Sequence, residues 1–127
     1  MNIFSILIPK HVLTYLNSND SLECAVDFIM ASSYTAVPVV DDKGQFVGTV
    51  SEGDFLKIVM EHGRYNLRNF KVEDIVHKND EGFVLNTTST EEIFEKILDR
   101  NFLSVIDDRN CFIGIITRKA VIQYLNK

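Results

Sequence analysis

Two short segments of the 127-residue chain combine a hydroxyl residue with charged residues in a pattern that suits phosphate chemistry. GTVSEGD, which begins at Gly48, places the Ser51 hydroxyl three residues before the Asp54 carboxylate. A helix that begins just after Ser51 would offer backbone N–H groups and the positive end of its dipole to a phosphate. The Ser51 hydroxyl can donate to the same phosphate, and Asp54 can accept hydrogen bonds from a ribose diol. This segment therefore suits an ordinary nucleotide.

The second segment, GIITRKA from Gly114, keeps the hydroxyl as Thr117 but has Ala120 where the first has its carboxylate, and it adds Arg118 and Lys119. The ligand that suits this segment does not need a hydrogen-bond acceptor for a ribose diol, but it does need more positive charge on the protein. A cyclic 3′,5′-dinucleotide meets both conditions, because its 3′ oxygens are esterified and each phosphodiester is negative. Arg118 can bind a phosphodiester bidentately, and Lys119 adds a point charge.

Each of these residues also has an ordinary structural interpretation. Ser51 and Thr117 can be simple helix N-caps. Asp54 can be a first-turn acid favoured by the helix dipole, and Arg118 and Lys119 can be a solvated surface pair. The matched position of the two segments favours ligand contact for the two cations, whereas the ligand role of Asp54 is weaker because its segment, GTVSEGD, contains no cation.

The two segments belong to an internal duplication. At an offset of 66 residues, YTAVPVVDDKGQFVGTVS (34–51) aligns without a gap on RNFLSVIDDRNCFIGIIT (100–117). Five residues recur unchanged in this alignment: Val39, Asp41, Asp42, Phe46 and Gly48. The chain therefore contains the same structural unit twice.

Each copy predicts the order β-α-β-β-α. In the first copy, VLTYL from Val12 predicts a strand, SLECAVDFIM a helix capped by Ser21, AVPVV and FVGTV two strands joined by a DDKG turn, and EGDFLKIVMEH a helix ended by Gly63. The inner face of the first helix is predicted to hold Leu22, Ala25, Val26, Ile29 and Met30. Pro38 favours an edge strand or a short one, and Cys24 is interpreted as a small core residue.

The second copy repeats the order with the strand FVLN, a helix in TSTEEIFEKILDR that begins at Thr88 or Ser89, the strands FLSVI and FIGII, and the helix RKAVIQYLN. We expect a first repeat at 8–62, a linker at 63–80 with a helical turn at 72–76, and a second repeat at 81–127. Repeats of about sixty residues bury little surface alone. They are expected to pack face to face about a pseudo-twofold axis, with a ligand cleft between them.

Composition excludes several classes of function. A hydrophobic content of 46% with 24% charged residues is ordinary for an α/β globular protein. A net charge of −5 argues against a nucleic-acid partner. The N-terminal MNIFSILIP is too short for a signal peptide or a membrane span. We therefore expect a cytoplasmic protein without a membrane partner, with Cys24 and Cys111 as free thiols.

No pattern of catalytic or metal-binding residues stands out. His11, His62 and His77 lack ligand spacing, so no metal site is expected. GTVSEGD departs from the G-x-S-x-G nucleophile elbow at Thr49, and the chain has no Walker loop or dinucleotide fingerprint. The expectation is a protein that is not an enzyme and has no cofactor.

YTAVPVVDDKGQFVGTVSEGD and NFLSVIDDRNCFIGIITRKA together resemble the tandem CBS (cystathionine-β-synthase) domain pair, over nearly the whole chain from about Pro9 to Leu125. The α/β fold of two β-α-β-β-α CBS repeats follows from this resemblance. Stand-alone pairs with ITRK in the second repeat resemble small Gram-positive proteins that bind cyclic di-AMP. In that family, adenine nucleotides lie between the repeats.

The resemblance implies two nucleotide sites, each built from both repeats. The main site comprises Thr14, Leu16, Tyr34, Thr35, Ala36, Val37, Thr117, Arg118 and Lys119. A second, weaker site comprises Ser51, Asp54, Val84, Asn86, Phe102 and Leu103. Tyr34 serves equally well as ordinary packing or as a stacking ring.

The expected function is a cytosolic sensor that binds cyclic di-AMP and regulates a partner protein, which by analogy is an enzyme such as the (p)ppGpp synthetase. The alternatives are a module that binds AMP, ADP or ATP through Asp54, and a dimerisation module without ligand. A homodimer is expected through the helices that carry Phe55, Ile58, Val59, Val121, Ile122 and Leu125. The competing interpretation is that these residues all serve the core of one chain.

Overall fold

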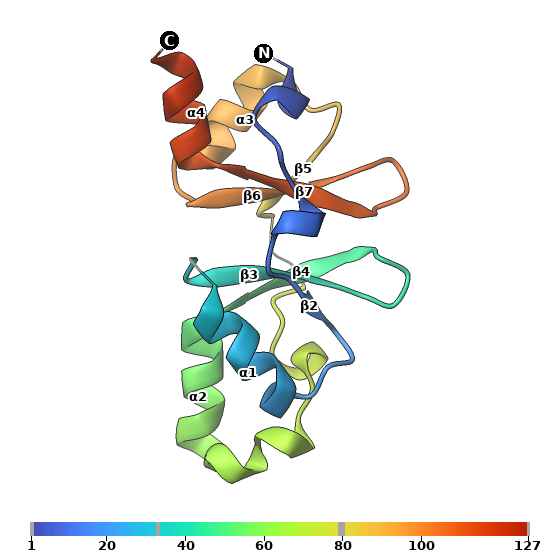
Figure 1. The fold of residues 1–127 in the computed structure, drawn as a ribbon, viewed down its shortest axis with the longest axis vertical. Coiled ribbons are helices and arrows are strands. Elements are labelled where there is room, and N and C mark those ends of the chain that lie inside the picture. Colours follow the sequence, from blue (N-terminus) through green and yellow to red (C-terminus); the bar gives the residue numbers. More distant parts are fainter. Residues whose placement is uncertain (1, 33, 79–80, 127) are drawn as a thin grey trace. The chain divides into compact units, whose positions relative to one another are not determined.

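The computed structural model describes residues 2–32, 34–78 and 81–126, and it divides the chain into two units. The first-repeat unit comprises residues 14–80, and the second-repeat unit comprises residues 1–13 together with 81–127. Each contains the predicted β-α-β-β-α order, which Figure 1 shows in the colours of the sequence. The mixed α/β fold and the duplication are thus confirmed. The face-to-face packing of the repeats stays a prediction.

The first-repeat unit is a three-stranded sheet with two helices. Its elements are β2 (Leu16–Asn17), α1 (Leu22–Ala31), β3 (Ala36–Val40), β4 (Phe46–Ser51) and α2 (Glu52–His62). The 3-10 helices η3 (Arg64–Asn69) and η4 (Val72–Asp74) follow. The strand order is β2-β3-β4, with β3 parallel to β2 and antiparallel to β4.

The second-repeat unit has the same plan with one additional strand. It contains β5 (Phe83–Leu85), α3 (Thr90–Ile97), β6 (Phe102–Ile106), β7 (Phe112–Thr117) and α4 (Arg118–Leu125). From the N-terminal segment it takes η1 (Ile3–Ser5), β1 (Ile8–Pro9) and η2 (Lys10–Val12), and the strand order becomes β1-β7-β6-β5. No helix within the described ranges is long and apolar enough to span a bilayer.

The last strand of each repeat, β7 or β4, pairs with a segment that precedes the other repeat in sequence. We call these two segments, around Ile8–Pro9 and around His77, the crossing segments. Ile8 and Pro9 pair with Ile115 and Gly114 of β7, and the N–H of His77 donates to the Thr49 carbonyl oxygen at 3.1 Å on β4. A Cβ on Gly114 would overlap the Ile8 carbonyl oxygen, and one on Gly48 would overlap that of His77. Glycine recurs at this place in both repeats because a side chain would occupy the path of the crossing segment.

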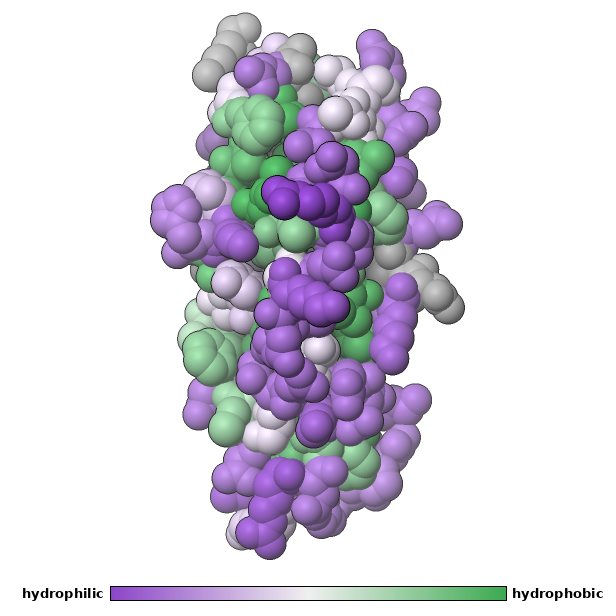
Figure 2. Space-filling model, turned by 90° about the vertical axis from the view of Figure 1, so that its right-hand side faces the viewer, coloured by the Kyte–Doolittle hydropathy of each residue, from purple (hydrophilic) through white to green (hydrophobic). Residues whose placement is uncertain are grey.

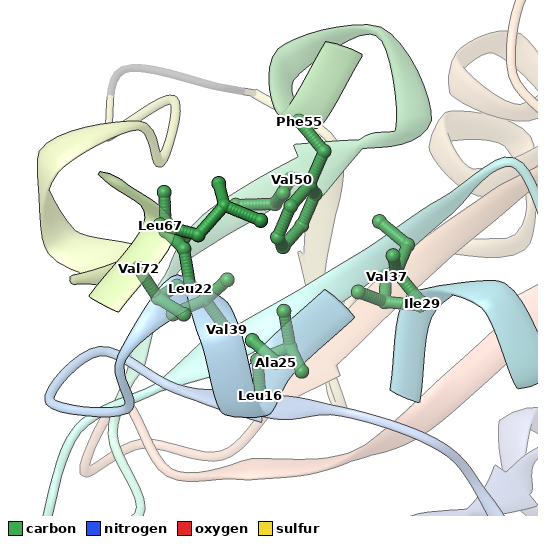
Figure 3. Packing of buried hydrophobic residues seen from close by; sticks show 10 residues of the cluster. All are labelled: Leu16, Leu22, Ala25, Ile29, Val37, Val39, Val50, Phe55, Leu67 and Val72. Atoms are coloured by element: carbon green, nitrogen blue, oxygen red, sulfur yellow. The ribbon is translucent and has the colours of Figure 1, made fainter. Parts of the chain in front are cut away.

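The predicted linker therefore packs as part of a unit. Leu67 and Val72 are buried in the core of the first-repeat unit, with Leu16, Leu22, Val50 and Phe55 (Figure 3). The predicted turn near Val72 is the 3-10 helix η4. Residues 79 and 80 of the linker lie outside the described residues. The boundaries 8–62, 63–80 and 81–127 describe the repeats in the sequence and remain a prediction. The two compact units are defined differently, by which residues contact one another in space.

Four local predictions need correction. The first strand begins at Leu16, because Val12 lies in a 3-10 turn that is closed by the Leu13 N–H on the Lys10 carbonyl oxygen. Pro38 lies in β3, the central strand, where its missing N–H costs little because β2 pairs only with Val39 and Val40. Cys24 and Met30 are exposed, since α1 turns only Leu22, Ala25 and Ile29 fully into the core.

The two hairpins repeat in detail. The Asp41 carboxylate accepts the N–H groups of Lys43 and Gln45, each at 2.9 Å, and Asp107 accepts those of Arg109 and Cys111 at the same distance. Gly44 and Asn110 follow with φ of 79° and 64°, the left-handed conformation that such turns require.

On the side that carries the β3–β4 hairpin, the surface of the first-repeat unit is mostly hydrophilic (lower half of Figure 2).

Candidate functional site

The start of α2 is closed by a reciprocal capping box. The Ser51 hydroxyl oxygen accepts from the Asp54 N–H at 3.3 Å, and Asp54 Oδ2 accepts from the Ser51 N–H at 2.7 Å. The Ser51 hydroxyl also lies 3.0 Å from the same Oδ2. The N-cap that the sequence allows at Ser51 is therefore present, and the capping box satisfies two donors that would otherwise be left unpaired at the helix end.

Asp54 has a further partner that the sequence analysis missed. His77 Nε2 lies 2.7 Å from Asp54 Oδ1, with the His77 side chain 63% exposed and the Asp54 side chain 18% exposed. His77 is 23 residues away in sequence and follows no recognisable spacing. The crossing segment brings it there, and Gly48 provides the room. Because the imidazole contacts Asp54 rather than the Ser51 hydroxyl, the three groups do not form an activated serine nucleophile.

The start of α4 has the same backbone plan and different charges. The Thr117 hydroxyl accepts from the Ala120 N–H at 3.0 Å, and no carboxylate lies in the first turn. The Arg118 side chain donates to Asn101 Oδ1 at 2.9 Å and to the Leu98 carbonyl oxygen at 3.4 Å. It is therefore partly held against its own unit, with other guanidinium donors left over. Lys119 is exposed and has no partner among the described residues.

Fewer helix N–H groups are free for a ligand than the sequence suggests. The first N–H, on Glu52 in α2 and on Arg118 in α4, donates at 2.9 Å to the carbonyl oxygen of the residue just before β3 or β6, which is Thr35 or Asn101. The third is taken by the hydroxyl cap in both helices. Within the described ranges, the Gly53 and Lys119 N–H groups remain open at the two helix starts. Each helix can thus donate one backbone hydrogen bond to an anion.

The predicted lining residues fall into two groups. Leu16 and Val37 are core residues of the first-repeat unit, and Val84 and Leu103 are core residues of the other, so their side chains pack inward. The remaining residues are half-buried or exposed and lie in loops or at strand ends: Thr14, Tyr34, Thr35, Ala36, Asn86 and Phe102.

Within each unit, the residues before the second strand lie beside the helix start. Ala36 pairs with Ser51, and Phe102 pairs with Thr117. The assembly of sites from both repeats stays a prediction. Among the described residues, no three His, Cys, Asp or Glu side chains form a group that could hold a metal ion.

Two curated proteins of Bacillus subtilis are similar to this chain over nearly its whole length. Cyclic di-AMP receptor B of Bacillus subtilis (strain 168) is 23% identical over 124 residues, which cover 95% of this chain and 84% of the relative. The UPF0053 protein YrkA of the same organism is 25% identical over 121 residues, 93% of this chain, but the match spans only 27% of that longer relative.

Solved structures agree. A CBS domain protein from Streptococcus pneumoniae TIGR4 has a TM-score of 0.86 and 30% identity, with 97% of this chain and 85% of the other covered. CbpB in complex with c-di-AMP (TM-score 0.89, 24% identity, 99% and 85% covered) and CBSX2 in complex with AMP (0.79, 24%, 98% and 96%) share the fold. The CBS domain model matches residues 6–61 and 72–127. The chain therefore belongs to the CBS domain family and carries two CBS domains.

Proposed function

We propose that this chain is a regulatory module that binds cyclic di-AMP through Thr117, Arg118 and Lys119. The observation that carries the proposal is the first turn of α4, which contains two cations and no carboxylate. Cations at the positive end of a helix dipole are unfavourable. A bound anion reverses this effect, because it interacts favourably with the cations, the open Lys119 N–H and the dipole together.

The ligand's identity follows from the same turn and from the relatives. Ala120 provides no hydrogen-bond acceptor for a free ribose diol. A cyclic dinucleotide has no such diol, because its 3′ oxygens are esterified. The relative named cyclic di-AMP receptor B, matched over 95% of this chain, favours adenine as the base. In the proposed complex, the bases lie against Tyr34, Thr35 and Ala36, near Thr14. Transmission to a partner protein requires that the partner distinguish the liganded from the free module.

Calorimetric titration with cyclic di-AMP tests the proposal. Arg118→Ala is expected to cost about 2 kcal/mol of binding free energy, as the loss of a charge-assisted contact does. Lys43→Ala, which removes an exposed cation at the β3–β4 hairpin, is the matched control and should bind as the wild type. Equal affinities of the wild type and Arg118→Ala would refute this site. Cyclic di-GMP should bind far more weakly, because guanine reverses the hydrogen-bonding groups at position six.

AMP, ADP or ATP is the second candidate ligand, favoured by the Ser51–Asp54 pair at the α2 start. The solved CBSX2 complex carries AMP on the same fold. Melting shifts with AMP and ATP but not with cyclic di-AMP would favour this candidate over the first.

We further propose that the chain forms a homodimer. The sequence predicts α2 and α4 as its surfaces; in α4, Val121 is buried while Ile122 and Leu125 are exposed, and an apolar groove lies between α1 and α2, so we place the contact on α1 and α2. A groove of about 350 Å³ lies between these helices, lined by residues such as Val26, Met30, Gly53, Leu56 and Val59. Phe28, Leu56 and Met60 are each more than half exposed, whereas Phe55 is buried in the core of the first-repeat unit. An apolar surface of this kind is suited to a second copy of the chain. Light scattering should give twice the chain mass, and Leu56→Asp should give the mass of one chain.

A further inference from the structure

The contact between His77 and Asp54 bears on which nucleotide the first repeat accepts. The backbone of His77 is fixed by its hydrogen bond to Thr49, while its imidazole extends over the open side of the Asp54 carboxylate. The capping box of α2 would form without this imidazole, since it uses Oδ2 and the histidine uses Oδ1. The contact is therefore an addition to the helix cap.

Counting acceptor positions shows what the imidazole takes away. An ionised carboxylate offers about four lone-pair positions. Ser51 occupies Oδ2 through its N–H and its hydroxyl, and His77 occupies one position on Oδ1. About one position is left, whereas a ribose diol that donates both of its hydroxyl groups needs two. A diol must therefore displace His77 before Asp54 can hold it.

The second repeat lacks both members of this pair. Ala120 stands at the position of Asp54, and Ile8 stands at the position of His77, as the matching contacts over Gly48 and Gly114 show. The two positions are far apart in sequence, yet the polar pair occurs complete in one repeat and is replaced by apolar residues in the other. This pattern fits two residues that act together.

We infer that His77 is a specificity-determining residue of the first-repeat nucleotide site, where it covers Asp54 and disfavours ligands that present a free ribose diol. The inference rests on the proposed function, since it assumes that this site binds nucleotides. A ligand whose 3′ oxygen is esterified presents only one free ribose hydroxyl, and the one remaining acceptor position on Asp54 can accept it without displacing His77. The side chain is exposed enough to rotate away, so a diol ligand binds only at the cost of the His77–Asp54 hydrogen bond.

The test is a titration of AMP against the wild type, His77→Ala, His77→Gln, Asp54→Asn and the double variant Asp54→Asn/His77→Ala. His77→Ala should bind AMP about tenfold more tightly, since the lost contact is a hydrogen bond to a charged group. His77→Gln, whose amide can still donate to Asp54, should stay closer to the wild type. In the Asp54→Asn background the His77→Ala change should have little effect, because the acceptor of both imidazole and diol is altered. Cyclic di-AMP affinity should change less than twofold.

Several outcomes overturn the inference: unchanged AMP affinity in His77→Ala, an equal gain for AMP and cyclic di-AMP, or a gain that persists in the Asp54→Asn background. Absence of AMP binding in all five proteins also overturns it, while cyclic di-AMP binding to the wild type in the same series would leave the proposed function standing. A ligand-free check is the imidazole NMR signal of His77, which should move on Asp54→Asn and not on Asp74→Asn.

Discussion

The starts of α2 and α4 are built alike and charged differently. Both have a hydroxyl N-cap and a first N–H that donates to the residue just before β3 or β6, and the strand before each helix carries a glycine next to the crossing segment. The first turn of α2 carries Glu52 and Asp54, whereas that of α4 carries Arg118 and Lys119. The backbone contacts are retained because the fold depends on them, and the exposed side chains are free to diverge. The difference between the repeats is thus a difference in charge on a common scaffold.

The crossing segments give the largest expected effect. Gly48→Ala and Gly114→Ala should each lower the free energy of unfolding by about 3 kcal/mol, because the new Cβ meets backbone oxygen that cannot easily retreat. Gly53→Ala is the control, since its Cβ would lie no closer than 3.6 Å to Ser51 Oγ and alanine favours a helix. Urea unfolding measures all three. If only one of the two variants is destabilised, the crossing segments are not equivalent.

The segment after α2 provides the second prediction. Val72→Ala should destabilise the protein by about 2 kcal/mol, because it removes two methyl groups from a fully buried position in the first-repeat core. Val12→Ala, at a position that is 64% exposed, should change the stability far less. Equal stabilities of the two variants in urea would show that residues 63–80 act as a simple linker.

Exchanging the charge pattern sharpens the comparison of the two helix starts. Ala120→Asp should complete a capping box on Thr117 and raise the free energy of unfolding by about 1 kcal/mol in the absence of ligand. The same change should weaken cyclic di-AMP binding, because it places a negative charge beside the proposed phosphate site. Unfolding and calorimetry on one preparation measure both effects. A variant that is stabilised and binds cyclic di-AMP as tightly as the wild type would contradict the proposed phosphate site at the start of α4.

The smallest expected effect concerns acid. The hydrogen bond from the Cys111 N–H is the main cause that holds the pKa of Asp107 below its ordinary value of 3.8, and the Arg109 N–H and charge act in the same direction. A carboxyl group with a lowered folded-state pKa contributes stability above its unfolded-state pKa and loses it as the pH falls through the folded value. Asp107→Asn should therefore lose less stability than the wild type as the pH falls through 3.8 and below, as measured by urea unfolding. A parallel loss in both proteins would contradict the assignment.

The features that could be predicted from the sequence are those formed by residues that lie close together in it. The caps at Ser21, Ser51, Ser89 and Thr117, and the turns at Asp41 and Asp107, all involve hydrogen bonds over two to four residues. Helical periodicity placed Leu22, Ala25 and Ile29 inside but assigned Met30 to the same face, because the buried stripe of α1 is narrower than its apolar pattern. Cys24 was misplaced because residue type was given more weight than position on the helix.

The amino-acid sequence alone determined the duplication, the order of elements, the helix starts and the opposite charges of those starts, since each depends on residue type and short-range spacing. The tertiary structure decided which segment crosses which sheet, and hence that residues 3–9 join the second repeat and residues 67–77 the first. It also brought His77 to Asp54 and left Cys24 exposed. These features depend on the path of the chain in space, because contacts between distant residues are set by the packing of whole elements and leave no spacing in the sequence to read.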